Sequence, residues 1–170
     1  MKNKFNILLL LLFSGMFSIN AQCFHYENMI DIIGKSTTDI NTFLTANNWK
    51  EGKPNAFNNF GRSIKSWSLN NEMGAICWID ICYKPNTKNI LVYQFISLDN
   101  YREIKDQIMM SGFVQQKMKI SANDMFYAFV KDDQSFILRK HTYDHETNGN
   151  FAIVMLPTTE LTKVWDSYAK

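Results

Sequence analysis

Apolar residues recur at helical spacing in three segments of the 170-residue chain. An α-helix has about 3.6 residues per turn, so one buried face shows apolar residues at i, i+3, i+4 and i+7. Ile40, Phe43 and Leu44 follow this spacing behind Ser36, which suits an N-cap position. A shorter helical turn precedes this segment, and Gly34 separates the two. The sequence predicts helices at 37–47, 100–111 and 159–168, with the short turn at 27–33.

Between and after the first helices the chain alternates short extended runs with turn residues. Asn148 and Gly149 form an Asn-Gly pair, which is the strongest short hairpin signal in the chain. Consecutive hairpins with short turns predict an antiparallel sheet with helices packed on one side, and therefore an α+β fold. The predicted strands are 62–69, 75–83, 89–96, 113–119, 125–130, 135–143 and 151–156.

The two halves of the chain have the same order of elements. Each half has a helix, a small polar break, one aromatic residue (Trp49 or Phe113) and then about four strands. This order predicts two tandem α-β-β-β-β units at 26–97 and 98–157, followed by a closing helix at 158–170. Residue identity between the halves is low, so the alternative is that helices and hairpins look repetitive by chance.

Several central strands are apolar on both faces and therefore need two covers. The helix layer supplies one cover, and the other is the closing helix, a sheet that folds over itself or a partner. Aromatic residues are common at the centres of interfaces, because they bury a large area with few rotatable bonds. The alternative for each such aromatic residue is the ordinary core. The residues predicted to contact a partner are Trp67, Trp78, Asp80, Tyr93, Phe95 and Tyr143.

The first 21 residues have the order of a secretory signal peptide. Lys2 and Lys4 precede an apolar run at 7–17, and a short segment of small and polar residues ends at Ala21. The uninterrupted apolar core is shorter than the ~20 residues of a membrane-spanning helix, and no later stretch spans a membrane. We expect cleavage to leave 22–170 as one compact domain in the periplasm or the medium. A lipid anchor on Cys23 is disfavoured because the two residues expected before a lipidated cysteine are poorly matched.

Composition and charge narrow the function classes. Apolar residues make up 46% and charged residues 20% of the chain, which is typical of a globular protein. The chain has 18 basic and 16 acidic side chains, so removal of Lys2 and Lys4 leaves 16 of each. A neutral chain does not suit a general nucleic-acid binder, which needs a basic face to displace counterions from phosphate.

The three cysteines are Cys23, Cys77 and Cys82. An oxidising compartment permits disulfides. Cys77 and Cys82 fall in one predicted strand, where five residues span about 17 Å, too far for a bond between them. Cys23 can pair with either Cys77 or Cys82. The alternative is that Cys77 and Cys82 are reduced and buried.

Motifs for catalysis and cofactor binding are missing from the sequence. His141 and His145 fall in a predicted strand, where they lie about 13 Å apart and do not share a metal ion. The chain has no G-x-S-x-G elbow, phosphate loop or dinucleotide turn, so we assign no catalytic residue, metal or cofactor.

These observations favour an exported, non-catalytic binding protein of the cell envelope, inhibitor-like or immunity-like, that binds a protein partner through a sheet face or loops. One alternative is a small envelope hydrolase that uses His141, His145, Asp144 or Glu146. The other is a carrier that holds a small ligand in a cavity between sheet and helices.

Overall fold

The computed structural model describes residues 24–54, 60–71, 74–121, 123–141 and 148–169. The elements in chain order are α2 (Tyr26–Ile33), α3 (Thr37–Ala46), β1 (Lys50–Gly52), β2 (Ser63–Asn71), β3 (Gly74–Tyr83), β4 (Ile90–Ser97), α4 (Leu98–Met110), β5 (Val114–Ile120), β6 (Asp124–Lys131), β7 (Gln134–His141), β8 (Asn148–Pro157), a short 3-10 turn (Thr158–Glu160) and α5 (Leu161–Tyr168).

The strands form one antiparallel sheet, which confirms the predicted α+β class. Its eight strands have the order β1-β2-β3-β4-β8-β7-β6-β5. The last strand of each half, β4 or β8, therefore lies at the centre, and the two pair antiparallel. The short strand β1 and the longer strand β5 form the two edges.

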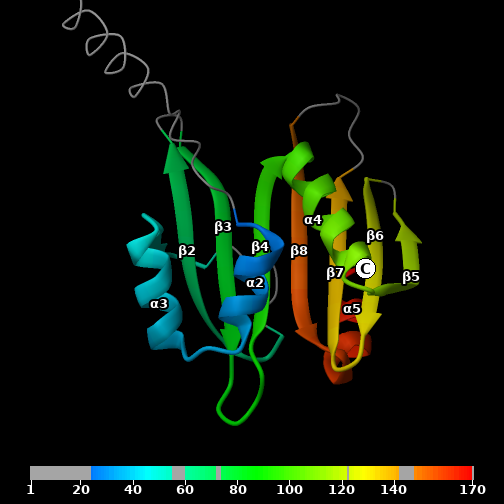
Figure 1. Cartoon of the computed structure of the whole chain (residues 1–170), viewed down its shortest axis with the longest axis horizontal. Helices are drawn as coiled ribbons and strands as arrows, with labels where there is room; N and C mark the ends of the chain where they lie inside the picture. Colours follow the sequence, from blue (N-terminus) through cyan, green and yellow to red (C-terminus); the bar gives the residue numbers. More distant parts are fainter. Residues whose placement is uncertain (1–23, 55–59, 72–73, 122, 142–147, 170) are drawn as a thin grey trace, which may run out of the picture.

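Two apolar cores lie on opposite faces of the sheet. Helices α2, α3 and α4 cover one face, and α5 lies behind the sheet (Figure 1). The closing helix was one of the covers left open for the second face, and α5 packs Leu161 and Val164 against that face. The physical reason is that strands apolar on both faces leave a second apolar surface, and the stripe of α5 removes it from water.

Local sequence explains where several elements begin and end. The Ser36 side chain accepts a hydrogen bond from the Asp39 backbone N–H at 3.2 Å, which confirms Ser36 as the N-cap of α3. After α4, Gly112 has a φ of +86°, the left-handed conformation that glycine adopts without strain. In the part of the chain that the structure describes, no helix combines the length and apolar character that crossing a membrane requires.

Candidate functional site

Three of the aromatic residues predicted to contact a partner lie in the core beneath α2, α3 and α4. Trp67, Tyr93 and Phe95 are at most 1% exposed. The ring centroids of Tyr93 and Phe95 are 4.5 Å apart in a stacked arrangement. A partner on the folded surface therefore has no access to these three side chains.

The remaining predicted partner residues have different surroundings. Trp78 is half-buried, and strand alternation places it on the α5 face with Asp80. Asp80 is fully buried and accepts a hydrogen bond from the Ser66 hydroxyl on the neighbouring strand. Tyr143 lies outside the described residues. Among the six, only Trp78 has a described side chain that reaches the surface.

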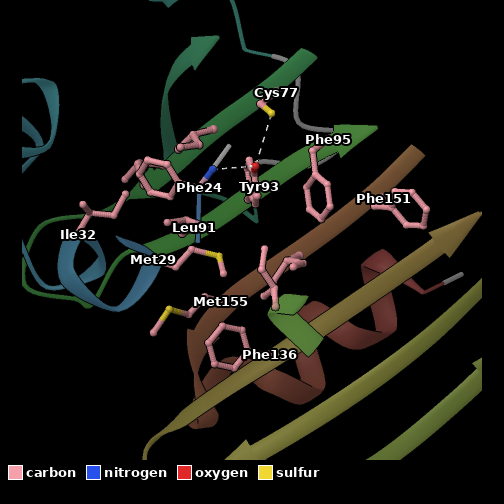
Figure 2. Close-up of a cluster of buried hydrophobic side chains, with 14 of the residues drawn as sticks. Phe24, Met29, Ile32, Cys77, Leu91, Tyr93, Phe95, Phe136, Phe151 and Met155 are labelled. Atoms are coloured by element: carbon pink, nitrogen blue, oxygen red, sulfur yellow. Dashed lines mark hydrogen bonds between the residues drawn. The ribbon is translucent and has the colours of Figure 1, made fainter. Parts of the chain in front are cut away.

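The Tyr93 hydroxyl joins the start of the described chain to the sheet (Figure 2). The Phe24 backbone N–H donates to it at 3.0 Å, and the Asn100 side-chain amide donates at 3.1 Å. The same hydroxyl donates to the Cys77 sulfur at 3.5 Å. Phe24 therefore lies on the face of the sheet that holds Cys77, whereas Cys82 belongs to the core on the other face. Cys23 itself lies outside the described residues.

The histidine-and-carboxylate group of the hydrolase hypothesis is described only in part. His141 Nδ1 lies 2.9 Å from Asp124 Oδ1, and Arg139 Nε lies 3.3 Å from the same oxygen. This carboxylate therefore faces both the Arg139 guanidinium and the His141 ring. Asp144, His145 and Glu146 lie outside the described residues. Over 24–54, 60–71, 74–121, 123–141 and 148–169, no three His, Cys, Asp or Glu side chains gather as a metal site would require.

A cleft of about 820 Å³ opens at the end of the sheet between the α2–α3, β3–β4 and β6–β7 turns. We call it the terminal cleft. Its apolar lining includes Ile33, Tyr83 and Pro157, and Lys84 and Lys88 are among its charged residues. The Lys88 ammonium forms an exposed ion pair with Asp133 and donates a hydrogen bond to its carboxylate. This hydrogen bond lowers the pKa of the Asp133 carboxyl.

Exposed apolar side chains gather at the edge of the sheet that β5 forms. Six large hydrophobic residues of the described chain are exposed, and five of them lie within twelve consecutive residues at the end of α4 and along β5. Their exposed fractions run from 49% to 84%. We call this group the β5 edge surface: Met109, Met110, Val114, Met118 and Ile120.

The turn between α4 and β5 holds this surface in place. Phe113 is buried there, with its ring centroid 5.0 Å from that of Phe136. The Lys131 ammonium donates to the Ser111 carbonyl at 2.8 Å, so strand β6 is tied to the end of α4. These contacts fix the start of β5 beside the helix.

A β-bulge divides the β5 edge surface between the two faces of the sheet. The register shifts between Gln115 and Lys117, so Val114 pairs with Val130 on the α5 face. Met118 pairs with Tyr127, which packs against the core under the other helices. Sequence reasoning missed this surface. The available signal was three apolar residues in a strand otherwise made of lysine and glutamine.

Comparison with known proteins identifies no relative of this chain. No family model, curated protein or solved structure matches this chain significantly. The functional argument therefore rests on the residues themselves.

Proposed function

We propose that this chain is an exported, non-catalytic binding protein of the cell envelope, inhibitor-like or immunity-like, whose β5 edge surface binds a protein partner. The observation that carries the proposal is the gathering of five of the six exposed large hydrophobic side chains on one short stretch. Exposed apolar side chains that gather along one sheet edge are typical of an interaction site, because exposing them to water lowers stability and solubility. Methionine suits such a surface because its flexible side chain adapts to its partner.

Charge favours an acidic partner over a second copy of this chain. Lys117 and Lys119 lie on β5 and, through their pairing with Ala128 and Phe126, on the α5 face of this edge. The Lys117 ammonium lies 5.7 Å from the centre of the Trp165 ring there. Symmetric pairing of two β5 strands would bring four ammonium groups together, and like charges across a strand pair are destabilising. Lysine on an edge strand is a common device against self-pairing. A partner that wraps the sheet edge and carries carboxylates on its α5 side complements the same lysines.

Export rests on the signal-like order of the first 21 residues. We expect mature protein that begins at Gln22 in the periplasm or the medium. N-terminal sequencing of the protein recovered from each cell fraction tests this directly. An intact Met1 in the membrane fraction would contradict it.

The strand order supports an ancestral duplication of an α-β-β-β-β unit. Each half runs from an edge strand to the centre, where β4 and β8 pair antiparallel. Such an arrangement relates the halves by an approximate two-fold axis. Superposition of 26–97 on 98–157 tests the proposal: equivalent strands should overlay in order, and a mismatch in order would refute it.

A second candidate function is the binding of a small ligand in the terminal cleft. Its volume of about 820 Å³ is in the usual range for ligand sites. Melting with a panel of small molecules tests it. A compound that raises the melting temperature of the parent chain but not of Tyr83→Ala would support this candidate.

The partner proposal is tested by capture followed by surface variants. The tagged full chain is expressed in its source cells, and bound proteins are recovered from envelope and medium. A partner that uses the β5 edge surface should be lost when Met118 and Ile120 are both changed to Asp. The matched control is Ile96→Asp, which places the same charge at the remaining exposed large hydrophobic residue of the described chain, on β4 and outside the β5 edge surface. Equal binding by the double variant and the parent would refute the proposal.

A further inference from the structure

A small pocket opens beside the β5 edge surface, between α4 and strands β6 and β7. Its volume is about 340 Å³. Met125 and Tyr127 of β6 line the pocket, and they pair directly with Ile120 and Met118 of the β5 edge surface. Side chains of paired residues lie on the same face of a sheet, so pocket and apolar surface are continuous. We call it the Tyr101 pocket.

The buried phenol of Tyr101 gives this pocket its chemistry. Tyr101 is only 4% exposed, and its hydroxyl has no hydrogen-bond partner in the part of the chain that the structure describes. An unsatisfied buried hydroxyl costs about 1–3 kcal/mol, so it favours a ligand that brings an acceptor. Burial raises the pKa of Tyr101 well above its usual range, and nearby Tyr127 adds to this, so the hydroxyl keeps its proton for donation.

The charged side chains around the pocket are mainly cationic. Arg102, Lys105 and Lys140 line it together with a single carboxylate, that of Asp106. The Lys105 ammonium lies 4.8 Å from the centre of the Tyr127 ring. Arg102 lies 3.5 Å from the exposed Asp99. Excess positive charge beside a neutral donor suits an anion.

We propose that the Tyr101 pocket binds the carboxylate of an acidic side chain on the partner that covers the β5 edge surface. This rests on the proposed function and specifies the partner's chemistry. One carboxylate oxygen accepts from the Tyr101 hydroxyl, and Lys140 and Lys105 neutralise the charge. The aliphatic stem of the acid lies against Leu98 and Met125, which also line the pocket. The Lys105 ammonium turns from the Tyr127 ring toward the carboxylate when the acidic side chain enters the pocket.

An acidic side chain fits the pocket better than a phosphate group. The pocket combines apolar walls with two tyrosine hydroxyls, those of Tyr101 and Tyr127, and three cationic side chains. The Tyr127 hydroxyl already donates to the Met125 sulfur at 3.9 Å, which leaves the Tyr101 hydroxyl as the unused hydroxyl donor among the described residues that line the pocket. Phosphate sites commonly use nests of successive backbone N–H groups, whereas the side chains that line this pocket offer an apolar wall beside the donors. A glutamate-like group instead presents an apolar stem and two acceptor oxygens.

Methyl NMR of the full chain with labelled methionines tests the pocket without the partner. Glutarate is the probe, and the uncharged glutaramide is its control at equal ionic strength. Glutarate should shift the Met125 methyl signal saturably, whereas the buried Met29 and Met155 should not respond. No Met125 shift, or an equal shift with glutaramide, overturns the proposal.

Variants separate the hydroxyl from general charge. Tyr101→Phe should weaken glutarate binding about tenfold, because it removes a hydrogen bond to a charged acceptor. Lys140→Gln should also weaken binding, and Lys163→Gln, an exposed change on α5, should leave it unchanged. Equal affinity for Tyr101→Phe and the parent overturns the proposal.

Binding of the captured partner to the Tyr101→Phe chain tests whether the carboxylate in the pocket belongs to that partner. The Tyr101→Phe chain should bind the partner more weakly than the parent chain does. If Tyr101→Phe loses glutarate but binds the partner as tightly as the parent, the acidic-side-chain proposal is wrong while the β5 edge surface stands. The variant with Met118 and Ile120 both changed to Asp tests the β5 edge surface separately: if it binds the partner as tightly as the parent, the proposed function is wrong.

Discussion

Replacing Tyr93 by Phe should destabilise the fold through one oxygen atom. The hydroxyl is the acceptor for the Phe24 backbone N–H and for the Asn100 side-chain amide, at 3.0 and 3.1 Å. Both bonds are buried. The phenylalanine ring keeps the stacking on Phe95, so little packing is lost. The perturbation therefore isolates the two donors left without an acceptor.

The expected loss follows from the cost of unsatisfied buried donors. Each costs about 1–3 kcal/mol, so two should lower the free energy of unfolding by about 2–6 kcal/mol. Urea unfolding, followed by far-ultraviolet circular dichroism, measures this change through the midpoint and slope. The slope should stay constant, because the chain buries the same surface.

Tyr101→Phe is the matched control. It makes the same chemical change on a buried tyrosine whose hydroxyl has no partner in the described part of the chain. Its free energy of unfolding should stay the same or rise by up to about 1–3 kcal/mol, since an unsatisfied buried hydroxyl is removed and no hydrogen bond is lost. If Tyr93→Phe and Tyr101→Phe unfold at the same urea concentration, the role assigned to the Tyr93 hydroxyl is refuted.

Three further predictions concern cysteines and the remaining surface tryptophan. Non-reducing peptide mass spectrometry should find Cys23 joined to Cys77, because Phe24 lies on the Cys77 face; a bond to Cys82 or a lipidated Cys23 would contradict this. In the chain-entropy model, reducing this bond should cost about 4 kcal/mol. Burial, with a smaller contribution from Asp80, raises the pKa of Cys82 from 9.0 to about 12, so the folded state holds its proton while the unfolded state loses it. Stability should therefore fall as the pH rises from 9.0 toward about 12, and Cys82→Ala should show a shallower decline in alkaline urea titrations. Trp78→Ala should lower the free energy of unfolding by about 2 kcal/mol, less than for a fully buried tryptophan, and leave partner affinity unchanged; a selective loss of affinity would place the partner on the α5 face.

Local periodicity was enough to predict most elements of the fold. Helices such as α3 and α4 carry apolar stripes that face the core, so the sequence spacing reflects their burial directly. Strand β1 was missed because its three residues are all exposed and have no apolar alternation. It forms by pairing with β2, a contact between residues distant in sequence.

The face on which a strand residue lies was harder to predict. Trp67 lies on β2 and Tyr93 and Phe95 lie on β4, either side of β3, and alternation alone does not say which face the helices cover. Helices α2, α3 and α4 together cover the face that holds them, and the Trp67 indole donates a hydrogen bond to Asn41 of α3. The same long-range packing placed α5 behind the sheet.

The candidate site depended on long-range order even more strongly. A strand was predicted near Val114, but its position at the sheet edge follows from the pairing of β4 with β8. The bulge after Gln115 then turned Val114 away from Met118. Tyr101 falls within the predicted helix at 100–111, and the sequence did not single it out as a site residue. Its hydroxyl has no hydrogen-bond partner in the described part of the chain, and this depends on tertiary packing that the sequence does not reveal.

Site-specific photo-cross-linking in the source cells tests the central claim most directly. A photoreactive phenylalanine analogue is placed at position 118 in one chain and at position 96 in another. Both positions are exposed hydrophobic residues, but only Met118 belongs to the β5 edge surface. The account predicts one discrete cross-linked protein from position 118 and none from position 96. A discrete cross-linked protein from position 96, with none from position 118, would contradict it.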